Sequence, residues 1–202
     1  MNIRHITIER EYGSGGTLIA RRLAEETGAS CYGREILEAV SAKQNISVED
    51  IEKYEESATN SFLYSLYIMG QAHSGNADML SIEGHVFVAE QAEIQRFSKN
   101  GKSIFLGHCA SYALKEQDGV LRVFIRCTDD AAKRSRIVNE YGVSPTMADV
   151  TRKRFDKKRA NYFYANTGKK WDDLKNYDIV LDSGVLGIES CVDILKALFC
   201  KW

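Results

Sequence analysis

The sequence predicts an α/β fold with about five parallel strands in one doubly wound sheet flanked by helices. Short β-branched or apolar runs alternate along the chain with longer stretches of helical periodicity, and strands separated by helices form right-handed βαβ units. Two runs, Ser103–Gly107 and Val120–Cys127, are almost continuously apolar, as expected for strands covered on both faces. The 202 residues suit a single domain, and 44% apolar with 27% charged residues is typical of a globular protein.

The first strand is expected at His5–Arg10, where β-branched residues alternate with polar ones. Gly16–Thr27 follows as a helix, because its apolar residues form one stripe and Gly28 supplies a stop. A short second strand at Ser30–Tyr32 leads into a helix at Arg34–Lys43.

A capping-box pattern at Ser47–Asp50 predicts the start of the next helix, which runs to Glu56. Asn60–Gly70 is aromatic and is expected to be helical, whereas the polar, glycine-containing stretch Gln71–Leu80 predicts a mobile loop. A long amphipathic helix is then expected at Ser81–Lys99.

The remaining elements follow the two apolar strands. A helix is expected after Thr128–Asp130, and a long basic helix is expected to begin at Ser144-Pro145, with the proline in its first turn. Tyr177–Asp182 predicts the last strand and Ile188–Phe199 the last helix.

Composition excludes several classes of protein. The net charge of −1 disfavours duplex nucleic acid as a partner. Five scattered cysteines form no C-x-x-C pair, which argues against a zinc clip and suits a reducing compartment. The sequence contains no apolar run of about 18 residues that could span a bilayer. We therefore expect a cytoplasmic protein with neither a membrane nor a nucleic-acid partner.

The loop Gly13-Ser-Gly-Gly-Thr17 lies between the first strand and the first helix. In that position, main-chain N–H groups and the helix N-terminus attract phosphate, and glycine allows close approach. Compared with the pattern G-x-x-x-x-G-K-[ST], Gly15 and Thr17 match, but Arg10 replaces the first glycine and Gly16 replaces the lysine. A glycine-rich turn that is tight only for packing is the alternative. A dinucleotide fingerprint fits less well, because its third glycine falls on Leu18.

The chain resembles the cytidylate kinase-like family, relatives of nucleoside monophosphate kinases. The resemblance is carried by ITIEREYGSGG, IARRLAEETG, CYGREIL, SIFLGHCASYAL, VLRVFIRC, RFDKKRANYFYANTGKKW and YDIVLDSGVLGIE, which occur in the family's order. It implies a single three-layer P-loop kinase-type domain over residues 1–202. Within that domain it implies a helical nucleoside-monophosphate-binding insertion at about residues 34–100 and a lid at about 144–170.

The resemblance also implies roles for individual residues, with ATP as donor and Mg²⁺ as its ion. Thr17 would bind Mg²⁺, and Arg34 and His108 would lie on the acceptor side. The donor phosphates would be wrapped by Gly13, Ser14, Gly15, Gly16 and Thr17. Relatives usually carry aspartate where this chain has Gly33 and arginine where it has His108. A packing or capping role for His108 is the alternative.

The basic run from Thr151 to Arg159 is identified by the resemblance as part of the lid. Arg152, Arg154 and Arg159 would neutralise charge that develops on the transferring phosphoryl group. The alternative is a solvated helical face with pairs of opposite charge. The charge absent at Gly16 would come from Arg10, from Arg21 or from this lid.

The sequence therefore predicts an ATP-dependent phosphotransferase whose partners are a nucleoside triphosphate and a small phosphate-bearing acceptor. Two alternatives remain: a nucleotide-binding module with impaired catalysis, and a kinase for a metabolite that is not a nucleotide. The aromatic stretch Phe62–Ile68 predicts either internal packing or a homodimer face. Tyr162–Tyr164 is expected to pack internally or at the lid hinge rather than to stack on nucleic-acid bases.

Overall fold

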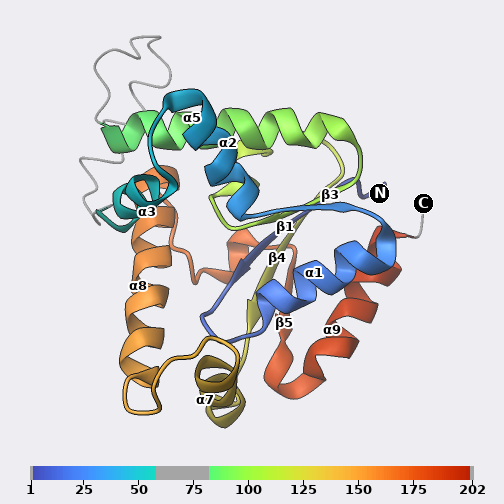
Figure 1. The fold of residues 1–202 in the computed structure, drawn as a ribbon. Coiled ribbons are helices and arrows are strands. Elements are labelled where there is room, and N and C mark those ends of the chain that lie inside the picture. The colour runs from blue at the N-terminus through green and yellow to red at the C-terminus, as the bar shows by residue number, and fades with distance from the viewer. Residues whose placement is uncertain (1, 58–81, 201–202) are drawn as a thin grey trace.

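The computed structural model describes residues 2–57 and 82–200. Five strands form one parallel sheet in the order β2-β3-β1-β4-β5, which confirms the predicted fold class (Figure 1). The strands are β1 (His5–Arg10), β2 (Ser30–Tyr32), β3 (Ser103–Leu106), β4 (Val120–Arg126) and β5 (Ile179–Asp182). Because β1 is central, its last residue, Arg10, lies among the carboxyl ends of its neighbours, opposite Ile125 of β4.

Helices cover both faces of the sheet (Figure 1). They are α1 (Gly16–Thr27), α2 (Arg34–Gln44), α3 (Val48–Ser57), α5 (Ile82–Phe97), α6 (Ala110–Ala113), α7 (Asp130–Asn139), α8 (Ala148–Thr167) and α9 (Ser183–Phe199). Short 3₁₀ turns occur at Ser98–Asn100 and Leu174–Asn176. None of the described helices is both long enough and apolar enough to cross a bilayer.

Side chains along the buried strands point alternately to the two faces of the sheet, so helices pack on both faces and the fold has three layers. Ile104 and Val123 belong to a core cluster shared with α1 and α9. The next residues along, Phe105 and Phe124, belong to clusters on the other face, where Phe124 shares its cluster with Phe163 of α8. Since successive strand residues point to opposite faces, uninterrupted apolar runs are what this double burial requires.

Most element boundaries agree with the sequence predictions, and three elements differ from them. The long basic helix begins at Ala148, because Pro145 lies in a turn closed by the bond from Met147 N to Ser144 O (2.9 Å). The last helix begins at Ser183 and is kinked at Gly187, whose φ is 75°. The four-residue helix α6 was not predicted. The predictions for Asn60–Gly70, Gln71–Leu80 and Phe62–Ile68 lie outside the described residues.

Candidate functional site

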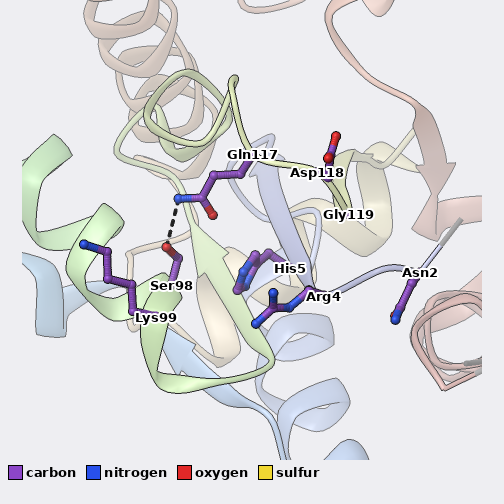
Figure 2. Close-up of a pocket in the computed structure, with 8 residues that line it drawn as sticks. All are labelled: Asn2, Arg4, His5, Ser98, Lys99, Gln117, Asp118 and Gly119. Atoms are coloured by element: carbon purple, nitrogen blue, oxygen red, sulfur yellow. Dashed lines mark hydrogen bonds between the residues drawn. The ribbon is translucent and has the colours of Figure 1, made fainter.

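Two cavities lie at opposite ends of the sheet. The one at the amino end has a volume of about 660 Å³ and is lined by Asn2, Arg4, His5, Ser98, Lys99, Gln117, Asp118 and Gly119 (Figure 2). The other, of about 520 Å³, lies at the carboxyl ends of β1 and β3 and extends to α8. Open parallel sheets bind ligands beyond the carboxyl ends of their strands. The smaller cavity, called here the carboxyl-end cavity, is therefore the candidate site.

Charged side chains of both signs line the carboxyl-end cavity. Its cations are Arg10, Arg34, Lys158 and Arg159, and its carboxylates are Glu9, Glu52 and Glu55. Aromatic surface is contributed by Phe155, Tyr162 and Phe163. A cavity of this size and lining suits a small ligand that combines an anionic group with hydrogen-bond donors.

The loop Gly13–Thr17 is held firmly between α7 and α9. Gly13 and Gly15 both have φ of 79°, a left-handed conformation that favours glycine. Arg136 of α7 donates from Nη1 to the carbonyl oxygen of Gly13 (3.0 Å), and Ser183 of α9 donates from Oγ to that of Ser14 (2.5 Å). Both bonds are accepted by carbonyl oxygens of the loop, so they do not occupy its N–H groups.

The N–H groups of the loop divide into two sets. Ser14 N donates to Glu11 O (3.2 Å), and Gly16 N donates to Ser14 Oγ (3.3 Å). Within the described part of the chain, the N–H groups of Gly13, Gly15 and Thr17 have no protein acceptor. Because α1 begins at Gly16, its N-terminal dipole adds partial positive charge beside them. The loop thus retains anion-binding capacity through part of its main chain.

The side chain of Arg10 fills the space that a side chain at Gly16 would need. The motif G-x-x-x-x-G-K-[ST] does not show this link between the two positions. A Cβ atom on Gly16 would lie 2.6 Å from Cβ and 2.9 Å from Cγ of Arg10. A side chain at position 16 would force Arg10 to shift at its Cβ, since real contacts of that kind are essentially never so short. The arginine at position 10 and the glycine that replaces the motif's lysine at position 16 are therefore linked by packing.

The guanidinium of Arg10 extends from this contact over the loop that follows β3. A Cβ on Gly107 would lie 2.5 Å from Arg10 Nη1, and the φ of 80° at Gly107 favours glycine there. Arg10 Nε is buried and has no hydrogen-bond partner among the described residues. Burial, reinforced by the charge of Arg159, lowers the pKa of Arg10 to about 9, so the side chain stays protonated near neutral pH. A half-buried cation whose Nε donor is buried and unpartnered within the described residues is a site that calls for an anion.

Helix α8 is docked against the residues that precede the loop. Arg159 donates from Nη1 to the carbonyl oxygen of Arg10 (2.8 Å), and Tyr12 N donates to Oδ1 of Asp156 (2.7 Å). The ring of Phe155 stacks on that of Tyr12, with centroids 4.6 Å apart. Burial lowers the pKa of Arg159 from its ordinary value, against the attraction of Asp156. These contacts bring two guanidinium groups, Arg10 and Arg159, to one wall of the cavity.

The other two arginines predicted for the lid lie elsewhere. Arg152 Nη1 is 3.8 Å from Oδ1 of Asp130 on α7, and Arg154 is exposed, with its guanidinium 5.3 Å from the centroid of the Phe155 ring. Neither lines the carboxyl-end cavity. Arg21, the other alternative source of charge, is exposed on α1.

The two residues predicted for the acceptor side both line the cavity. Arg34, at the start of α2, is exposed and pairs with Glu52 (3.3 Å) and Glu38 (3.4 Å). His108 lies 2.8 Å from Glu55 through Nδ1, and its main chain adopts φ of 53° between two other residues of positive φ. His108 therefore contributes a hydrogen-bonding side chain to the cavity rather than a cap to α6, which is preceded by Cys109.

Sequence reasoning assigned no role to several residues that shape the site. Lys133 and Arg136 project from α7 toward the loop, where Lys133 Nζ pairs with Glu11 Oε2 (2.7 Å). Their spacing of three residues puts both on one helical face, and this spacing in the sequence could have indicated a shared position. Glu55 and Glu90 come from two separate helices, and nothing in the sequence pairs them.

Glu9, which precedes Arg10 on β1, gives the site a testable pH dependence. Its carboxylate is buried and accepts a bond from Trp171 Nε1 (3.0 Å). Burial raises the pKa of Glu9, and the nearby Arg10 opposes the rise only in part. The protonated form is therefore favoured by folding, so this contribution to stability is complete below the unfolded-state pKa and is lost as pH rises through the folded-state pKa.

A Glu9→Gln variant keeps an acceptor for Trp171 but cannot ionise. We expect its free energy of unfolding to exceed that of the wild type increasingly as pH rises from about 4.3, by up to about 1.4 kcal/mol per pH unit until the folded-state pKa is passed. Urea denaturation between pH 4.5 and 8 measures the difference. The exposed Glu116→Gln variant is the control. A difference that is the same at both ends of the range contradicts the expectation.

Comparisons with known proteins support the fold described above. The model of the cytidylate kinase-like family matches residues 5–185. A crystal structure of an uncharacterized protein from Eubacterium ventriosum ATCC 27560 superposes with a TM-score of 0.71 at 22% identity, covering 98% of this chain and 99% of that one. A shikimate kinase from Acinetobacter baumannii in complex with shikimate gives a TM-score of 0.49 at 10% identity, covering 97% and 92%. No curated protein sequence matches the chain significantly.

Proposed function

The chain belongs to the cytidylate kinase-like family, and from that premise we propose that it is an ATP-dependent phosphotransferase. It would transfer the γ-phosphoryl group of ATP to an oxygen of a small, phosphate-bearing acceptor of the nucleoside monophosphate type, releasing ADP. The observation that carries this proposal is the half-buried, protonated Arg10, whose Nε is buried without a partner in the described part of the chain. It lies against Gly16 of the loop and has a free donor at the cavity.

The donor side of the proposal rests on the loop. The N–H groups of Gly13, Gly15 and Thr17 would hold the donor phosphates, and the Thr17 hydroxyl in the first turn of α1 suits a Mg²⁺ ion. Mg²⁺, when bound, supplies neutralisation of the donor's phosphate charge. The residues present fit both groups, since three N–H groups without a protein acceptor among the described residues and one hydroxyl lie within five residues at the N-terminus of α1.

The transfer itself would depend on positioning and charge. Arg10 and Arg159 would stabilise the charge that spreads over the transferring phosphoryl oxygens, because phosphoryl transfer needs little covalent chemistry from the protein. Arg152 and Arg154 would assist only after movement of α8 from its present contacts. Arg34 would bind the anionic group of the acceptor, and His108 with Glu55 would accept or donate bonds to its polar groups.

We assign the acceptor-side insertion to about residues 34–100 and the lid to about 144–170, within one domain. The five cysteines are all free, which suits a cytoplasmic protein.

Gly15→Val is predicted to abolish nucleoside triphosphate binding. A Cβ at position 15 would lie 2.4 Å from Ile188 Cδ1, and φ of 79° disfavours any side chain. Gly28→Val is the matched control, because Gly28 has φ of 70° but open space around it. Both variants should lose about 1–2 kcal/mol of stability to backbone strain. Only Gly15→Val should lose binding of a fluorescent ATP analogue; equal loss in both variants would show that the loop's conformation is not specifically required.

The proposed function is tested by incubating the purified protein with ATP, Mg²⁺ and a panel of acceptors, and measuring ADP. The panel includes nucleoside monophosphates and small hydroxylated metabolites, since the carboxylates in the cavity favour an acceptor with hydrogen-bond donors. Acceptor-dependent ADP release supports the phosphotransferase. Saturable ATP binding with no turnover on any acceptor would instead identify a nucleotide-binding module.

A further inference from the structure

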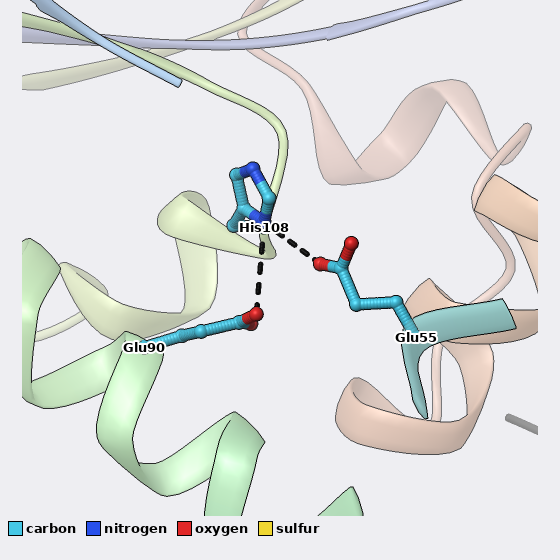
Figure 3. A group of neighbouring side chains, drawn as sticks. All are labelled: Glu55, Glu90 and His108. Atoms are coloured by element: carbon cyan, nitrogen blue, oxygen red, sulfur yellow. Dashed lines mark hydrogen bonds and ion pairs between the residues drawn. The ribbon is translucent and has the colours of Figure 1, made fainter. Parts of the chain in front are cut away.

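A cluster of three side chains at the acceptor end of the cavity has the composition of a metal site. Glu55 of α3, Glu90 of α5 and His108 after β3 place their ligand atoms within 4.8 Å of one another. Both carboxylates are turned toward the imidazole (Figure 3). The distances from His108 Nδ1 are 2.8 Å to Glu55 Oε1 and 3.8 Å to Glu90 Oε1.

One atom of the cluster is left without a partner. The side chain of Glu90 is fully buried, and its Oε1 accepts no hydrogen bond from any described residue. A buried carboxylate oxygen in this state carries a substantial desolvation cost. An ion pair between His108 and Glu55 alone leaves that cost in place, whereas a cation bound between the three side chains removes it.

The balance of charge points to a divalent ion. Two carboxylates surround one imidazole, so a doubly charged cation with a neutral His108 makes the cluster neutral. Ligand atoms at about 2.0–2.2 Å from a tetrahedral ion lie about 3.3 Å from each other, and the observed 2.8 and 3.8 Å fall on either side of that value. The third pair, Glu55 and Glu90, lies within 4.8 Å, so the three ligand atoms surround a space of about the size that such an ion needs.

The surroundings hold the three ligands in place. Tyr162 donates its hydroxyl to Glu90 Oε2, and Gln91 Nε2 donates to the carbonyl oxygen of His108 (3.1 Å). The left-handed backbone of His108, with φ of 53°, is a conformation that only its surroundings can maintain. Partners of this kind orient metal ligands in proteins. His108 and Glu55 also line the cavity, which gives an ion a route from solvent.

We propose that Glu55, Glu90 and His108 form a binding site for Zn²⁺ or another first-row divalent transition metal. An imidazole ligand selects this class over Mg²⁺, which prefers oxygen ligands alone. The ion is distinct from the Mg²⁺ assigned to Thr17. Its remaining coordination positions face the cavity, where water or an oxygen of a bound molecule can occupy them. The proposal does not rest on phosphoryl transfer, because the site forms without nucleotide.

Calorimetric titration of the metal-free protein with Zn²⁺, in the absence of nucleotide, tests the proposal. A Cys200→Ser background removes the exposed thiol. We expect one Zn²⁺ per chain, and no comparable binding of Mg²⁺. Titration with Co²⁺ should give visible absorption bands without a thiolate charge-transfer band, since the ligands are nitrogen and oxygen. A wild type that binds no Zn²⁺ at micromolar concentrations overturns the proposal.

Variants locate the site. His108→Ala and Glu55→Gln should each lower Zn²⁺ affinity by more than about 100-fold, and Tyr162→Phe by about 10- to 100-fold through loss of orientation. His85→Ala, an exposed histidine on the same helix as Glu90, should leave the affinity unchanged. Glu55 is partly exposed, so its variant carries the test if His108→Ala fails to fold. Zn²⁺ affinity that survives in Glu55→Gln, or falls equally in His85→Ala, refutes the assignment.

Discussion

Replacement of Arg10 by glycine is expected to lower kcat/KM for phosphoryl transfer by a factor of about 10²–10³, the usual effect of removing one preorganised donor from a transition state. The reason is that Arg10 supplies a half-buried positive charge between Gly16 of the loop and Gly107 after β3, where the sequence has no lysine. Steady-state kinetics on the acceptor found in the panel assay measures the loss.

The Arg10–Gly16 contact permits a sharper form of this test. Gly16→Lys alone should destabilise the protein by about 1–3 kcal/mol, because its Cβ would overlap the Cβ of Arg10, which is fixed to a central strand. In Arg10→Gly/Gly16→Lys the overlap is gone and a cation returns to the loop. The double variant should be at least about tenfold more active than Arg10→Gly, a non-additive result. A double variant no more active than Arg10→Gly would show that charge at these positions is not interchangeable.

Arg159→Ala is expected to produce the second large effect, a fall in kcat/KM of about 10²-fold. It removes both a guanidinium at the cavity wall and the 2.8 Å bond from α8 to the carbonyl oxygen of Arg10. Arg159→Lys should recover little, since an ammonium group lacks the planar fork that spans main chain and phosphate.

Lys157→Ala is the matched control for Arg159→Ala, because Lys157 is an exposed cation on the same helix. It should change kcat/KM by less than about twofold. Arg152→Ala and Arg154→Ala should have effects between the two, in keeping with their contacts to Asp130 and Phe155. Losses equal to that of Arg159→Ala in all of these variants would indicate a diffuse field from α8 rather than a specific contact.

The fold was predictable because it depends on patterns of local sequence. Uninterrupted apolar runs at Ser103–Gly107 and Val120–Cys127 indicated strands covered on both faces, and the structure has both as neighbours of β1. The kink at Gly187 depends on how the loop and α9 pack, which no local pattern reports.

The site was predictable only in part. The place of the loop and of His108 at the carboxyl-end cavity follows from strand and helix order, because carboxyl ends of parallel strands meet at one edge. That Arg10 and Gly16 fill a single space could not be read from residues six apart in the sequence, since the contact depends on the fold of the turn between them. Glu55, Glu90 and Tyr162 come from three helices, and their meeting depends on tertiary packing.

A crystal structure of the protein with Mg²⁺ and a non-hydrolysable ATP analogue tests the central claim most directly. The terminal phosphates should lie at the N–H groups of Gly13, Gly15 and Thr17, with the Arg10 guanidinium within about 3 Å of a γ-phosphate oxygen. Phosphates bound at the loop with Arg10 still unpartnered, or a nucleotide bound elsewhere, would contradict it.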